Sequence, residues 1–158
     1  MMNPPRRWPL DKMLRSFGAI FAGCVAAGIL IMIVEVLGHA AFPPPEKYRD
    51  ALKSDDMKVR EAAIKEYLPQ APVGALLAVV ISWGMGTTAG SALAVRLARR
   101  KHRQHGLIVG CIMMGCGIMM LVVLPHPTWM TVLGILVFPA ATWTGVTYGQ
   151  RRMESQPS

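Results

Sequence analysis

The sequence predicts an all-α protein, a membrane-embedded four-helix bundle in which residues 1–158 form one domain. Three observations lead to this prediction. Hydrophobic residues make up 53% of the chain and charged residues only 16%, whereas soluble domains carry about 25% charged residues. The chain contains four apolar stretches of about 18 residues or more, the length that crosses a bilayer. Its excess of basic over acidic residues lies only in every other segment outside the spans, as expected for segments on one side of a membrane. A soluble enzyme, a disordered protein and a disulfide scaffold are thereby excluded.

The four spans are expected at about residues 17–37, 69–97, 107–124 and 128–148. Span one is followed by prolines at 43–45, which cannot continue a helix. Residues 46–67 form the only sizeable polar segment, and the apolar residues among its charges predict one or two short amphipathic helices near the interface. The Pro125-His126-Pro127 turn joins the last two spans as an antiparallel hairpin. A backbone in hydrocarbon must satisfy its own hydrogen bonds, so the spans are predicted to be helices.

The net charge of +8 is distributed by position. Residues 1–15 carry four bases and one acid, segment 96–105 carries five bases and no acid, and segment 38–68 carries six of each. This positive-inside pattern places both termini and the 98–106 loop in the cytoplasm, and excludes a nucleic-acid partner. Histidines 102 and 105 of that loop are interpreted as solvated. Anionic lipid headgroups are expected at Arg96, Arg99, Arg100, Lys101 and Arg103.

Small residues recur every four positions along span two, where they favour close helix packing in lipid. They are Gly74, Ala78, Ser82, Gly86, Gly90 and Ala94. A four-residue step drifts about 40° around a helix, so the stripe is expected to spiral and to be covered by more than one partner. Shorter sets occur elsewhere, at Ala19, Gly23 and Ala27, at Gly106 and Gly110, and at Gly145 and Gly149. Packing within one bundle and self-association both remain open.

Pro139 lies near the middle of span four. A proline there is expected to kink the helix and to free the backbone carbonyl near Ile135. Such a kink shapes helix packing in most membrane helices, and in some it marks a gate or a site.

Glu35 is the only acidic residue within the four spans, and ionisable residues there suggest function. It is expected at the outer edge of the hydrocarbon, since it follows Arg15 by 20 residues, or about 30 Å of helix. His39 follows four residues later and shares its helix face, and His126 of the outer turn could join them. This candidate outer-face polar cluster could bind zinc or copper, relay protons, or fix the outer loop by hydrogen bonding.

Other chemistry has weak support in the sequence. Cys111 and Cys116 alternate with methionines in span three, a soft-ligand set that suits Cu(I) but also suits ordinary packing. The sequence has no nucleophile elbow, phosphate loop, Cys-x-x-Cys pair or pair of carboxylates within the membrane spans. We therefore predict a protein that is not an enzyme and has no cofactor.

Three short motifs resemble a family of small, uncharacterised bacterial integral membrane proteins with four spans. They are Leu37-Gly38-His39 leading to Phe42-Pro43-Pro44-Pro45, Leu68-Pro69 with Gly74-Ala75, Trp83 and Gly86, and Pro125-His126-Pro127-Thr128-Trp129 with Pro139-Ala140-Ala141. The resemblance implies a location in the bacterial cytoplasmic (inner) membrane and a similar helical hairpin arrangement, and it assigns no activity. The charged segment 46–67 departs most from the family pattern.

Two functions remain as hypotheses. The first is a structural or accessory membrane protein whose outer face near His39, residues 43–45 and His126 binds a partner, either another membrane protein or a second copy of the chain. The second is a small oligomeric transporter or ion- or metal-handling protein that uses Glu35 and His39.

Overall fold

The computed structural model describes residues 9–98 and 102–154, and every element in these ranges is a helix, which confirms the predicted all-α class. Arg99, Arg100 and Lys101, three of the residues expected to bind lipid headgroups, lie outside the described residues. The elements in chain order are α1 (Pro9–Ala41), α2 (Glu46–Leu52), α3 (Met57–Tyr67), the 3₁₀ turn η1 (Leu68–Gln70), α4 (Val73–Leu97), α5 (His102–Val123) and α6 (Thr128–Glu154).

Four of these helices, α1, α4, α5 and α6, are long and apolar enough to cross a membrane, as predicted. The ends of two of these helices differ from those of the expected spans. The fourth long helix continues past Tyr148 to Glu154. The second begins at Val73 and not near Pro69, because Ala71 is extended before Pro72 and the chain from Leu68 to Gln70 forms a 3₁₀ turn.

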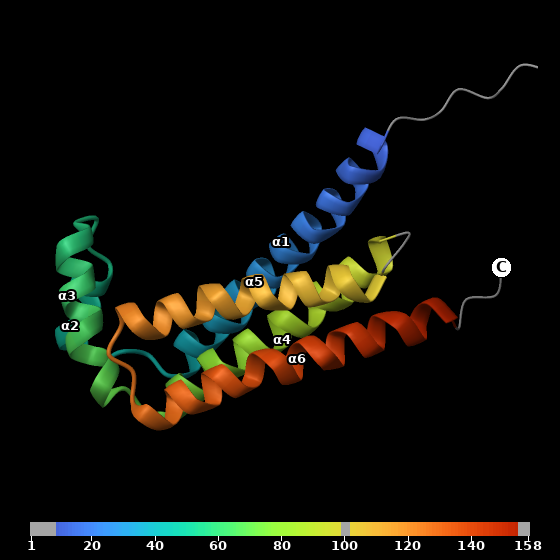
Figure 1. Ribbon diagram of the computed structural model, residues 1–158. Helices are drawn as coiled ribbons and strands as arrows, with labels where there is room; N and C mark the ends of the chain where they lie inside the picture. Colours follow the sequence, from blue (N-terminus) through green and yellow to red (C-terminus); the bar gives the residue numbers. More distant parts are fainter. Residues whose placement is uncertain (1–8, 99–101, 155–158) are drawn as a thin grey trace, which may run out of the picture.

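The four long helices form a bundle in which α4 packs against α1, α5 and α6 (Figure 1). α5 also packs against α6 and, less extensively, against α1. The beginning of α1, the end of α4, the beginning of α5 and the end of α6 lie at one end, which we call the basic end (Figure 1). The short helices α2 and α3 lie at the other end, together with the α5–α6 turn.

From Ala78 to Ala94 the small-residue stripe of α4 faces α1, and Gly74 faces Phe42 just after that helix, so α1 contacts more of the stripe than expected. The pairs are Gly74 with Phe42, Ala78 with Gly38, Ser82 with Glu35, Gly86 with Ala27 and Ile31, Gly90 with Gly23 and Ala27, and Ala94 with Gly23. The reason is that α1 carries a matching four-residue row, which consists of Gly23, Ala27, Ile31 and Glu35. Such rows are inclined to the helix axis, and two of them interlock when the helices cross obliquely.

A neighbouring row of α4 packs against α5 and α6. The core cluster here comprises Leu76, Val80, Trp83, Met130 and Phe138, and the rings of Trp83 and Phe138 stack with their centres 5.5 Å apart. Towards the basic end the packing again depends on glycines. A Cβ atom on Gly145 would collide with the backbone of α4 at Thr88, and one on Gly110 would collide with the Thr142 side chain. The glycine pairs of spans three and four therefore pack within the bundle.

His105 was expected to be solvated, but only 8% of it is exposed, so this interpretation is wrong. Because α5 begins at His102, His105 already lies in the first turn of the helix, next to the buried Gly106. The Nδ1 atom of His102 lies 3.1 Å from the backbone oxygen of Val95, near the end of α4.

Residues 46–67 form two short helices, as the sequence predicts, and we call α2 and α3 the hairpin. Buried Tyr48 holds it together, since its hydroxyl donates to Glu66 Oε1 at 3.0 Å and accepts from the amide of Gln70. The rings of Tyr48 and Tyr67 lie 5.4 Å apart, and partial burial raises the pKa of Tyr67. Asp56 caps α3 by accepting from the backbone N–H of Lys58 at 2.8 Å. The hairpin is therefore a small folded unit.

Candidate functional site

The candidate site lies where α1 approaches the first half of α4, and its central group is the Glu35 carboxylate. Glu35 is in phase with Gly23, Ala27 and Ile31, so the row that packs on α4 also turns this side chain towards α4. The hydroxyl of Ser82, which is fully buried, lies 3.3 Å from Glu35 Oε1 and donates to it. Glu35 itself is only partly buried. The carboxylate thus has a specific partner across the contact between α1 and α4.

The Ser82 hydroxyl has two acceptors within reach but a single hydrogen. Besides the Glu35 carboxylate, the backbone oxygen of Val79 lies 2.7 Å from Ser82 Oγ. An ionised Glu35 accepts the Ser82 hydrogen. A protonated Glu35 would instead donate its own hydrogen to Ser82 Oγ and leave the Ser82 hydrogen for Val79. The contact can therefore be kept in either protonation state of Glu35.

His39 lies one turn after Glu35 on α1 and is exposed. Its Nδ1 atom lies 2.7 Å from the backbone oxygen of Glu35 and donates to it in the tautomer that carries hydrogen on Nδ1. We expected the two side chains to pair. The ring bonds the main chain of Glu35, and the carboxylate is turned to Ser82.

Glu35 and His39 line one small cavity, of about 60 Å³, between the end of α1, η1 and the beginning of α4. A water molecule needs about 10–15 Å³ of such cavity volume, so the cavity has room for a few waters. Sites for drug-sized molecules are several times larger. The remaining lining is mainly apolar, with Phe42, Tyr67 and Leu76 among its larger side chains.

His126, the third member of the predicted cluster, does not line this cavity. Its Nδ1 atom lies 2.9 Å from the backbone oxygen of Leu124 in the α5–α6 turn. The structure therefore brings Glu35 and His39 to one cavity and gives His126 a local role in its own turn. Within residues 9–98 and 102–154, no group of three or more histidine, cysteine or acidic side chains is arranged to hold a metal ion.

Two other sequence features have less to do with the site. Cys111 and Cys116 are exposed free thiols on α5. Helix α6 continues through Pro139, so the proline does not interrupt the span. The Pro139 ring is exposed on the side of α6 that lies towards Cys111, where both residues line a groove.

Sequence reasoning missed Ser82 as the partner of Glu35. It was placed in the packing stripe, where it does lie, but its hydroxyl is the one polar side chain among the six residues of that stripe. A polar residue in a row of small residues, opposite the only acidic residue in the expected spans, is the signal that could have found the pair.

The Glu35–Ser82 contact is expected to stabilise the α1–α4 interface by about 1 kcal/mol, as hydrogen bonds between membrane helices do. A double-mutant cycle with Glu35→Ala and Ser82→Ala measures it, using SDS-induced unfolding of the purified protein in detergent. We expect a coupling energy of about 0.5–1.5 kcal/mol. Two strictly additive substitutions would show that the carboxylate and the hydroxyl do not interact. Glu35→Ala with Thr144→Ala, on the exposed side of α6, provides a control pair that should be additive.

Comparison of the chain with protein families, with curated proteins and with solved structures found no match.

Proposed function

We propose that this is a non-enzymatic, multi-pass protein of the bacterial cytoplasmic membrane with a structural or accessory role. In this proposal the four long helices anchor the chain with both termini in the cytoplasm. The hairpin stands on the opposite side of the membrane, where it binds a partner protein or a second copy of the chain.

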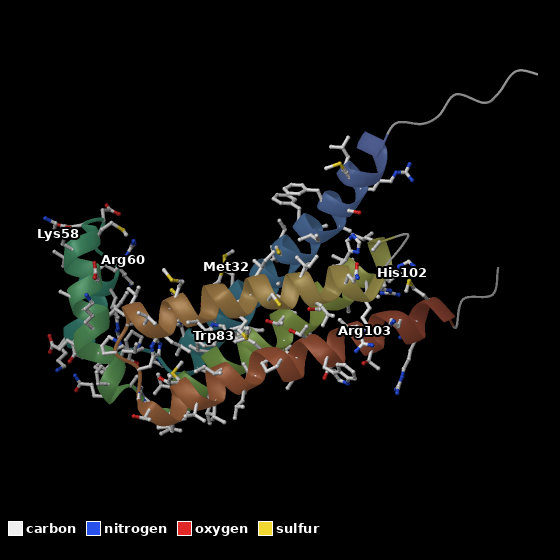
Figure 2. All side chains as sticks on the ribbon, viewed as in Figure 1. Met32, Lys58, Arg60, Trp83, His102 and Arg103 are labelled. Atoms are coloured by element: carbon white, nitrogen blue, oxygen red, sulfur yellow. The ribbon has the colours of Figure 1, made fainter. Side chains whose placement is uncertain are left out.

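The observation that carries the proposal is the isolation of the hairpin. Among the described helices, α2 and α3 pack against each other and α3 packs against η1, whereas their backbones do not approach α1, α4, α5 or α6; the Tyr67 side chain at the end of α3 lines the cavity beside α1 and α4. Figure 2 shows Lys58 and Arg60 on the part of α3 that stands away from the bundle. The surface includes exposed Met57 and Val59 beside these cations, a mixture of apolar and charged groups that suits a protein contact.

The anchoring role is supported by the packing of the long helices. Glycine-to-backbone contacts bring α1 and α6 close to α4, which makes a tight body. The cavity beside Glu35 admits only water-sized molecules. A tight body with a projecting folded unit fits a scaffold better than it fits a catalyst.

Native mass spectrometry of protein released gently from its own membrane tests the proposal. The variant replaces residues 46–67 with a flexible Gly-Ser linker, which leaves the four long helices unchanged. We expect the unaltered chain to carry a bound protein or a second copy, and the variant to be a bare monomer with the same thermal midpoint. A bare monomer for both proteins, or an equally assembled variant, would contradict the proposal.

The second candidate function is a small oligomeric transporter or ion- or metal-handling protein that uses Glu35 and His39. One observation favours it: the carboxylate lines a water-sized cavity together with His39 and can keep its Ser82 contact in both protonation states. Proton flux into proteoliposomes tests this function, with Glu35→Gln and His39→Ala as variants and Glu61→Gln on α3 as control. Flux in the unaltered protein that is lost in Glu35→Gln and His39→Ala but kept in Glu61→Gln would favour transport, and flux no greater than in empty vesicles would exclude proton transport.

A further inference from the structure

We infer that the basic end of the bundle holds an anionic phospholipid, with its phosphate on Arg103 and an acyl chain in a groove between α5 and α6. The inference rests on the membrane location given in the proposed function, but not on the partner binding proposed for the hairpin. It depends on the bundle lying in a membrane, on the shape of one groove and on the cation at its mouth.

The groove runs along the lipid-facing side of the α5–α6 contact and has a volume of about 260 Å³. Its lining consists of Leu107, Gly110, Cys111, Met114, Phe138, Pro139, Thr142 and Trp143. The one hydroxyl among these residues, that of Thr142, already donates to the backbone oxygen of Phe138 at 2.7 Å. The walls therefore present hydrocarbon, sulfur and aromatic surface, which an acyl chain can fill without leaving a polar group unpaired.

Glycine and proline create this groove. A side chain at Gly110 would collide with Thr142, so the two helices approach closely at that level. The exposed ring of Pro139, about one turn before Thr142 on α6, forms part of the groove wall. The groove is thus a consequence of the fold and not of one mobile side chain.

Arg103 lies at the end of the groove nearest to the basic end. Its guanidinium carbon lies 4.9 Å from the centre of the Trp143 ring, and Trp143 is itself a groove residue. A cation above an exposed indole is positioned at the level of lipid headgroups, where tryptophan concentrates in membrane proteins. The Trp143 ring therefore connects the apolar groove to the charged mouth.

The surroundings of Arg103 are suited to a phosphate. A shallow hollow next to it is lined by His102, Arg103, Gln104 and Gln150, whose side chains all offer hydrogen-bond donors (Figure 2 labels His102 and Arg103). The sequence of α5 contains no acid, and the only acid in that of α6 is Glu154. An anion at this point meets donors and positive charge, whereas the neutral headgroup of a zwitterionic lipid gains less from them.

Native mass spectrometry of the full chain in mixed micelles tests the inference with two lipids of identical acyl chains, phosphatidylglycerol and phosphatidylcholine. Arg103→Gln removes the cation at the bound phosphate and should lower the ratio of bound phosphatidylglycerol to phosphatidylcholine about fivefold. Arg151→Gln removes the same charge from the same end, but Arg151 lines neither the groove nor the hollow, and its charge is screened by salt, so the ratio for this variant should stay within about twofold of that of the unaltered protein. Arg152 is not used as the control because it lies over Tyr148, which lines a different groove.

A second variant tests the apolar half of the site. Cys111→Trp, at an exposed position in the groove wall, should fill the groove and reduce the retention of both lipids. An unchanged lipid ratio in Arg103→Gln would overturn the inference. An equal fall of the ratio in Arg103→Gln and Arg151→Gln would also overturn it, because anionic lipid would then be attracted by the overall positive charge of this end and not bound at one site. Unchanged retention in a folded Cys111→Trp would show that no acyl chain occupies the groove.

Discussion

Gly90→Ala is expected to lower the free energy of unfolding of the bundle by about 2 kcal/mol, which is the range for overpacking a tight contact. The added methyl group would collide with the backbone oxygen of Gly23 and come within 2.8 Å of the Ala27 side chain. A backbone oxygen cannot rotate away as a long side chain can. The whole of α1 must therefore shift relative to α4, and the contacts on either side of Gly90 weaken with it.

Gly28→Ala provides the matched control for this prediction. Gly28 also lies inside a long helix, but a Cβ atom built on it meets nothing within 4 Å. Alanine is the better helix former by up to about 1 kcal/mol, so this variant should be neutral or slightly more stable. SDS-induced unfolding of both purified variants in detergent gives the comparison. Equal effects at the two positions would show that α1 and α4 do not pack through the small-residue stripe.

Phe138→Ala is expected to lower the free energy of unfolding by about 3 kcal/mol, the second large effect. Phe138 is 2% exposed, stacks on Trp83 and contacts Gly117, so its removal leaves a cavity where α4, α5 and α6 meet. In a membrane the surrounding lipid is as apolar as the core, so the loss comes mainly from missing packing contacts.

Leu136→Ala is the control for Phe138→Ala, because Leu136 lies on the same helix and is 59% exposed. Leu136→Ala should lower the free energy of unfolding by less than about 0.5 kcal/mol, as most substitutions at exposed positions do. The ratio of the two losses, measured by thermal unfolding in the same detergent, is the informative quantity. Similar losses would place Phe138 on the surface of the bundle and contradict the packing of α6 against Trp83.

The class and the number of long helices could be predicted because hydrophobic length is a strong, local signal. The helix ends were less predictable, since they depend on individual caps. Pro72 and the extended Ala71 before it move the start of α4 to Val73, and a run of apolar residues does not record such detail. The burial of His105 was missed for the same reason, because the start of α5 sets it.

The candidate site was predictable in part. Glu35 could be found because a charge in an apolar helix is rare, and His39 because it follows by one turn. The position of His126 depends on how the α5–α6 turn folds, which the spacing of residues in the chain does not determine. The long contact between α1 and the α4 stripe was not predicted, because the drift of four-residue steps around α4 was considered alone, whereas the matching row on α1 drifts with it.

We propose that the hairpin lies on the outer side of the membrane and the basic end on the cytoplasmic side. Labelling with a membrane-impermeant thiol reagent tests it most directly, in a variant whose Cys24, Cys111 and Cys116 are replaced by alanine. A single cysteine is then introduced at the exposed position of Lys53 in the hairpin or of Arg151 at the basic end. We predict that Lys53→Cys reacts in intact cells whose outer barrier is permeable to the reagent, and that Arg151→Cys reacts only after the cytoplasmic membrane is opened. Reaction of both cysteines from outside, or of Arg151→Cys alone, would contradict this arrangement of the hairpin and the basic end.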